Sequence, residues 1–134
     1  MMGLASTLRL DRAMRAPILV AALLRLALMT AAYARTGTQI MTQGDTASYL
    51  EPGRNLILHG IFSTARQPEI DRTPGYPIFA MLTGMAFGNV LLTVAAQILI
   101  SLITMLVLSR IADRLYPNRR IGIRAAWLYA VEPL

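Results

Sequence analysis

The sequence predicts an all-helical protein that crosses a membrane more than once. Hydrophobic residues make up 55% of the 134 residues and charged residues only 15%, and the apolar residues are gathered into long blocks. One block, residues 90–108, contains no charged side chain. Because a helix needs about 20 mostly apolar residues to cross a bilayer, this block alone predicts a membrane span. The predicted fold class is therefore all-α, a multi-span helical membrane protein.

Three apolar segments are the predicted spans. Residues 16–34 form the first, which is interrupted by Arg25, and residues 89–110 form the second. A third begins at residue 121 and is still apolar where the sequence stops, at residue 134. A chain seldom ends inside a span, because its terminal carboxylate would lie in hydrocarbon. We therefore expect residues 1–134 to be the N-terminal part of one longer transmembrane domain.

The distribution of charge predicts the orientation of these spans. Residues 1–16 carry three arginines and one aspartate, residues 109–124 five arginines and one aspartate, and residues 35–88 equal numbers of basic and acidic side chains. Arginine-rich short loops stay on the cytoplasmic side. We expect a cytoplasmic tail at 1–15, a cytoplasmic loop at 111–120 and an external or periplasmic loop at 35–88, in the plasma (inner) membrane. This distribution also argues against nucleic acid as a partner, despite the net charge of +6.

A cleavable signal peptide is the alternative interpretation of the N-terminus. A basic start, an apolar stretch and the small residues around Tyr33 fit that pattern. The length of the stretch and the arginine in its middle argue against cleavage. Residues 35–88 lie outside under either interpretation.

The external loop is expected to contain interfacial helices. A helix is predicted over residues 45–58, with Asp45 as its N-cap and a C-terminal stop at Gly60. Pro52 predicts a kink or the start of a new helix within this segment. Residues 61–73 are predicted to be irregular, and Pro74, Gly75 and Pro77 a turn. Residues 78–87 are too short to span, which suits an interfacial or re-entrant helix.

Two residues of this loop suit chemistry at a membrane surface. Asp45 is a candidate general base for an acceptor hydroxyl, since partial burial would bring its pKa closer to a useful value. Arg72 is a candidate ligand for a lipid phosphate, because a guanidinium fork matches phosphate oxygens. Each has a plainer alternative. Asp45 can be an N-cap only, and Arg72 an interfacial anchor near anionic headgroups.

Other polar residues leave their roles open. Arg25 is expected to mark an interior face, with a donor-phosphate or helix-packing contact as one interpretation and snorkelling from a shifted span as the other. Tyr49 and Tyr76 are typical of interfacial aromatics. His59 is interpreted as a surface residue, and the pattern contains no metal site. The candidate substrate-binding residues are Arg72, Arg54, Tyr76 and Arg25.

The order of short motifs in this loop resembles that of glycosyltransferase family 39 and its relatives. The motifs are GD-x-x-x-Y at 44–49, RNL-x-x-HG-x-FS at 54–63 and RTPGYPIF at 72–79. That family includes the protein mannosyltransferases and the bacterial lipid-linked aminoarabinose transferases, which share the GT-C fold. The resemblance implies a polyprenyl- or dolichyl-phosphate sugar as donor, Asp45 as the catalytic carboxylate and Arg72 as a contact of the lipid phosphate. Many members carry an acidic pair where this chain has Asp45-Thr46.

The expected function is therefore a membrane glycosyltransferase that moves a sugar from a polyprenyl-phosphate donor to a lipid, glycan or protein acceptor. Its expected partners are these substrates and membrane lipids, and no cofactor is expected. Further acidic residues and a C-terminal domain of the family would lie beyond residue 134, so these residues alone are expected to be inert. The alternative is a non-enzymatic multi-span protein, such as a transporter fragment or small assembly subunit. A transporter usually places its broken helices at the bilayer midplane, whereas here the polar and proline-rich features gather in the external loop.

Overall fold

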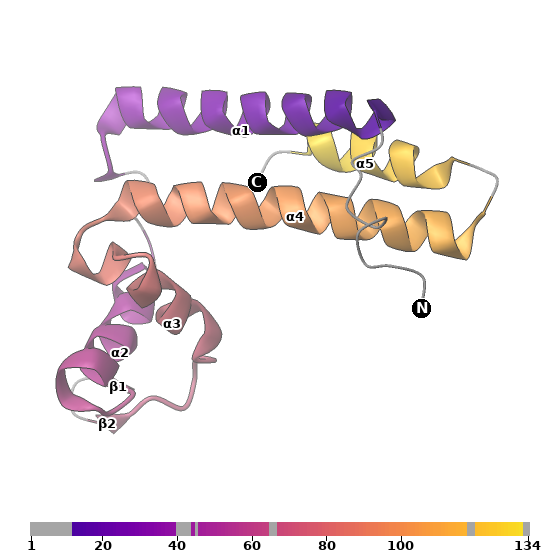
Figure 1. Cartoon of the computed structure of the whole chain (residues 1–134). Coiled ribbons are helices and arrows are strands. Elements are labelled where there is room, and N and C mark those ends of the chain that lie inside the picture. Colours follow the sequence, from indigo (N-terminus) through magenta and orange to yellow (C-terminus); the bar gives the residue numbers. More distant parts are fainter. Residues whose placement is uncertain (1–11, 40–43, 45, 65–66, 118–119, 133–134) are drawn as a thin grey trace. The chain divides into compact units, whose positions relative to one another are not determined.

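The computed structural model describes residues 12–39, 44, 46–64, 67–117 and 120–132, and most of these residues are helical (Figure 1). The helical elements are η2 (Arg12–Met14), α1 (Arg15–Thr36), α2 (Thr46–His59), α3 (Gly75–Leu82), η4 (Met85–Phe87), α4 (Val90–Leu115) and α5 (Ile121–Val131). Two short strands, β1 (Ser63–Thr64) and β2 (Gln67–Pro68), complete the described elements. The predicted helical class is confirmed at this level.

Helices α1 and α4 are long and apolar enough to cross a bilayer. They contain 22 and 26 residues. At a rise of ~1.5 Å per residue their lengths are about 33 and 39 Å, against ~30 Å for a bilayer's hydrocarbon core. Large apolar side chains remain exposed on both, such as Leu23 at 65% and Leu99 at 60%. Such surfaces suit contact with lipid chains better than contact with water.

The ends of these helices differ in one place from the predicted spans. Helix α4 continues to Leu115, so half of the predicted loop at 111–120 is helical. The added turns contain Asp113 and Arg114, which are exposed. Helix α5 begins at residue 121, as predicted, and is 11 residues long.

The chain forms two compact units, which are described separately. The first comprises the described residues up to Leu28 and those from Ile98 onward, and the second is Met29–Gln97. In the first unit, α5 runs back alongside α4. The backbone amide of Gly122 in α5 bonds to the Asp113 carboxylate of α4, and the Tyr129 hydroxyl of α5 lies 3.3 Å from Ser101 Oγ of α4. A buried cluster joins the three helices of this unit. Its buried members are Ala21, Met105, Ala126 and Ala130.

Small residues permit the close approach of α4 and α5. A Cβ added to Gly122 would collide with the Asp113 carboxylate and the Ser109 carbonyl oxygen. The Gly122 amide donates to Asp113 Oδ1 at 2.8 Å. A carboxylate from α4 therefore satisfies one of the unpaired amides at the N-terminus of α5, where negative charge is favourable.

In the second unit, α2 runs without interruption through Pro52. Of the two predicted alternatives at this residue, the start of a new helix is therefore wrong, and a kink stays a prediction. Pro52 and Gly53 are the buried residues of α2, and an added Cβ on Gly53 would lie 2.8 Å from the carbonyl oxygen of Pro77 in α3. Packing of α2 on α3 thus holds a helix across a residue that disfavours one locally. The predicted stop is confirmed, since Gly60 has φ +70° and its amide donates to Leu56 O at 3.0 Å.

The segment after α2 is more regular than predicted. β1 and β2 form an antiparallel pair, with Ser63 opposite Pro68 and Thr64 opposite Gln67. The Asn55 side-chain amide on α2 donates to Ser63 O at 2.8 Å and ties this hairpin to the helix. Strands of two residues each are too short to show the alternating pattern that identifies a strand in a sequence, which explains why residues 61–73 were expected to be irregular throughout.

The apolar segment at 78–87 is two elements rather than the single helix predicted. Helix α3 begins earlier, at Gly75, and ends at Leu82, and η4 follows. Gly84 has φ +79° in the left-handed region, which favours glycine and ends a helix. The buried residues of this part are Ala80, Met85 and Val90, with Leu50 and Val94 packed against them.

Candidate functional site

The second unit holds an arginine whose guanidinium lies over the face of one tyrosine ring. The Cζ atom of Arg72 lies 4.1 Å from the centroid of the Tyr49 ring. Tyr49 meets Tyr76 edge-to-face, with centroids 5.6 Å apart and planes at 89°. Tyr76 in turn lies 6.2 Å from Phe79. We call these four residues the Arg72 cluster.

The cluster is assembled from three segments that are distant in sequence. Tyr49 is in the first turns of α2, Arg72 is in the bend before α3, and Tyr76 and Phe79 are in α3. The crossing of α2 and α3 at Gly53 brings these segments together. Tyr76 also directs its hydroxyl to Met85 Sδ at 3.8 Å, which ties the cluster to the apolar core of the unit.

The guanidinium of Arg72 retains its in-plane donors. The side chain is half-buried, and the structure shows no hydrogen bond or ion pair between it and another described residue. Arginine carries five N–H donors around the edge of a plane. A contact with a ring face needs no oxygen acceptor, so the donors that no described residue accepts remain for an anion. A planar fork with free edge donors matches two oxygens of a phosphate or carboxylate.

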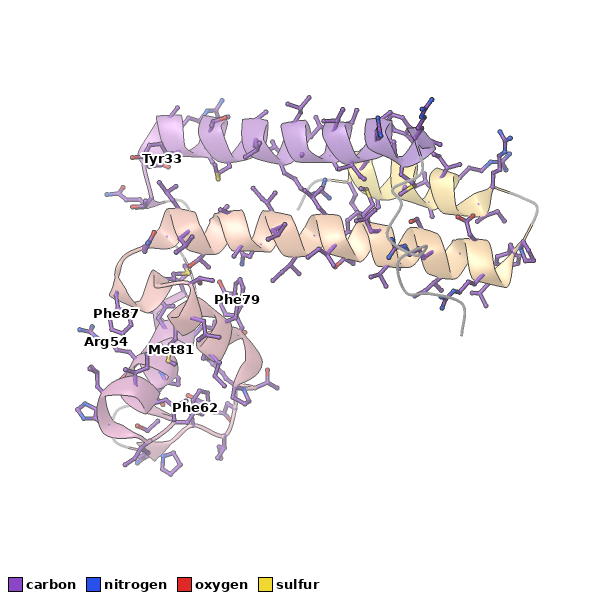
Figure 2. The ribbon with its side chains drawn as sticks, viewed as in Figure 1. Tyr33, Arg54, Phe62, Phe79, Met81 and Phe87 are labelled. Carbon is purple, nitrogen blue, oxygen red and sulfur yellow. The ribbon has the colours of Figure 1, made fainter. Side chains whose placement is uncertain are left out.

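The other residues predicted for this loop are placed differently. Asp45, the predicted catalytic carboxylate, lies outside the described residues. Arg54 is exposed on α2, and Figure 2 shows it on the opposite side of the unit from Phe79. Of the four predicted substrate-binding residues, the structure therefore brings Arg72 and Tyr76 together and leaves Arg54 apart.

Arg25 belongs to the first unit and is only 4% exposed. All five of its N–H donors have an acceptor within that unit, and its Cζ lies 5.4 Å from the Tyr129 ring centroid. The acceptors are Ser101 Oγ at 3.1 Å and the carbonyl oxygens of Ala21 at 3.2 Å, Ala130 at 3.3 Å, Tyr129 at 3.2 Å and Glu132 at 3.4 Å. These contacts fit helix packing rather than snorkelling. A bound phosphate would require at least one of these bonds to open.

Sequence reasoning missed two participants in these arrangements. Tyr49 was interpreted as an interfacial aromatic, and Ser101 was not assigned as a partner of Arg25. Their partners, Arg72 and Arg25, lie 23 and 76 residues away in sequence. The only available signal was the presence of Tyr49 and Arg72 in the same ordered set of motifs.

Metal binding has no evident place in the described part of the chain. No group of three or more His, Cys, Asp or Glu side chains lies close enough to hold an ion among these residues. His59 is exposed at the end of α2. The chemistry that the described site offers is therefore anion recognition by Arg72.

Comparison of the chain with protein-family models, with curated proteins and with solved structures finds no match.

Proposed function

We propose that this chain is part of a membrane glycosyltransferase that takes its sugar from a polyprenyl-phosphate donor. The observation that carries the proposal is the half-buried guanidinium of Arg72, which lies over the Tyr49 ring with its N–H donors unused by the described residues. This arrangement follows in sequence after one helix able to cross a bilayer and precedes another. A lipid phosphate presents its charge at the membrane surface, where such a guanidinium would meet it.

The ordered motifs of residues 44–79 supply the rest of the proposal. Asp45 is the base that accepts the proton of an acceptor hydroxyl, while the acceptor oxygen forms a bond to the anomeric carbon. The bond from that carbon to the donor phosphate breaks, and the polyprenyl phosphate leaves with the electron pair. Arg72 stabilises the negative charge that accumulates on this phosphate. The acceptor is a lipid, a glycan or a protein.

The proposed location is the plasma (inner) membrane, with the N-terminus cytoplasmic and residues 35–88 external. The arginine-rich segment at 109–124 supports this orientation. Arg54, Tyr76 and Arg25 remain proposed contacts of the substrate. Tyr76 has the strongest support of the three, because it packs in the Arg72 cluster.

Binding of an isoprenoid phosphate tests the role of Arg72. The probe is farnesyl phosphate, added to the chain in phosphatidylcholine nanodiscs and compared with uncharged farnesol. Arg72→Ala should weaken farnesyl phosphate about tenfold to hundredfold, because each hydrogen bond to a charged group contributes about 1.5–3 kcal/mol. Arg35→Ala is the control, since Arg35 is an exposed arginine in the last turn of α1, outside the Arg72 cluster. Equal affinity of the two variants would contradict the proposal.

Sugar transfer tests Asp45. In membranes containing the gene product as expressed, Asp45→Asn keeps the shape and the hydrogen-bonding oxygen but removes the base. A general base contributes about 10²–10⁴-fold to rate, so transfer should fall by that factor while farnesyl phosphate still binds. An N-cap alone would leave transfer nearly unchanged, because asparagine caps helices as well as aspartate does. Near-normal transfer by Asp45→Asn would therefore remove this residue from the mechanism.

A further inference from the structure

Tyr49 is the only described residue whose side chain is shown in contact with the Arg72 guanidinium. Arg72 lies in a bend between β2 and α3, and its neighbours Asp71 and Thr73 are both exposed. No helix or strand therefore fixes the direction of its side chain. The Tyr49 ring, 4.1 Å from Cζ, lies well inside the distance of about 6 Å at which a cation is attracted to an aromatic face.

The ring itself is held in place. The ring belongs to α2. The Tyr76 ring of the adjoining helix α3 packs against it, with the two ring planes at 89°. The structure shows no hydrogen bond of the Tyr49 hydroxyl to a described residue. The aromatic face, rather than the hydroxyl, is thus the part of Tyr49 that meets the arginine.

This geometry restrains the arginine without consuming its donors. A free arginine side chain has many rotamers, and that freedom is lost when it binds a ligand. A ring under the guanidinium removes part of this freedom before binding. The contact of a cation with a ring face needs no oxygen acceptor, whereas phosphate oxygens accept from N–H donors, so both contacts can exist together.

We propose that Tyr49 is a positioning residue that presents the edge of Arg72 to the phosphate of an isoprenoid donor. This inference rests on the phosphate-binding role proposed for Arg72. Tyr49 acts through that arginine and does not itself touch the phosphate. The aromatic face is the required feature, so phenylalanine at this position keeps the positioning role and an aliphatic residue does not.

Four variants in phosphatidylcholine nanodiscs test this coupling with farnesyl phosphate as the probe. Tyr49→Leu should weaken binding about fivefold, within the range of about twofold to thirtyfold that cation–π contacts give. Tyr49→Phe should bind within about twofold of the unchanged chain, since the aromatic face remains. In the Arg72→Ala background, Tyr49→Leu should cause no further loss. A general packing defect would instead lower binding in both backgrounds, and far-UV circular dichroism checks that each variant is folded.

The outcomes separate the inference from the function on which it rests. If Arg72→Ala weakens binding but Tyr49→Leu does not, the positioning role is overturned and the phosphate-binding role stands. If Tyr49→Leu weakens binding equally in both backgrounds, the positioning role is again overturned. If Arg72→Ala has no effect, both fall. Displacement of farnesyl phosphate by phosphatidylglycerol at equal mole fraction would assign Arg72 to lipid headgroups and overturn the inference.

Discussion

Replacement of Arg25 by methionine should loosen α5 from α1 and α4. Helix α5 ends at Val131, so the carbonyl groups of its last turn lack donors from the helix itself. Arg25 on α1 donates to two of them, those of Tyr129 and Ala130, at 3.2 and 3.3 Å. An arginine from one apolar helix thus caps the C-terminus of another. Methionine fills a similar length but donates nothing, and these acceptors would lose their partner.

The expected loss can be worked from the bonds. Four of the five hydrogen bonds of Arg25 reach beyond its own turn, to Ser101 and to three carbonyl groups of the C-terminal segment. Interhelical hydrogen bonds in membrane proteins contribute about 0.6 kcal/mol each on average, so the four contribute about 2.4 kcal/mol. The contact with the Tyr129 ring adds about 0.5–1 kcal/mol. We expect Arg25→Met to lower the free energy of unfolding by about 3 kcal/mol. Ser101→Ala removes the hydrogen bonds with Arg25 and with the Tyr129 hydroxyl and should lower it by about 1.2 kcal/mol.

The single tryptophan of the chain, Trp127, lies in α5 and reports on its packing. Unfolding by sodium dodecyl sulfate in dodecyl maltoside micelles, followed by Trp127 fluorescence and circular dichroism, gives the free energy of each variant. Arg35→Met is the matched control, since Arg35 is exposed on the same helix α1. If Arg25→Met and Arg35→Met unfold at the same detergent fraction, the reasoning is refuted. The cost of burying the charge would then offset the bonds it makes.

Three further predictions concern close helix packing and topology. Gly53→Ala places a Cβ 2.8 Å from Pro77 O and should destabilise the protein by about 1–3 kcal/mol; Gly75→Ala, which meets nothing within 4 Å, should be nearly neutral in the same detergent titration. Gly122→Ala should lower the free energy of unfolding by at least as much, because its Cβ would collide with the α4 backbone. An unchanged midpoint of the detergent titration would contradict the tight α4–α5 crossing. Gln67→Cys, at an exposed position in a chain without native cysteine, should react with an impermeant maleimide from outside intact cells; labelling only after lysis would reverse the proposed orientation.

Much of the helical framework could be predicted from the sequence. A long uncharged run and its length predict α4 without knowledge of any partner, because a helix satisfies its backbone bonds within one segment. The end of α2 at Gly60 was also predictable from local sequence, because the left-handed backbone conformation that ends a helix favours glycine. The burial of Arg25 followed from the cost of exposing a charge to hydrocarbon. Arg72 and Tyr76 were also candidates from the sequence, although nothing there indicated that both contact Tyr49.

Other features were decided only by tertiary structure. Pro52 breaks isolated helices, yet α2 continues through it because the adjacent Gly53 packs directly on α3. Arg25 finds acceptors more than 100 residues away, at the end of α5, and no spacing in the sequence indicates such a pair. Tyr49 receives Arg72 only because α2 and α3 cross at that glycine. Helix formation depends on neighbours three or four residues apart, whereas the direction of a guanidinium depends on which distant surfaces the packed helices bring beside it.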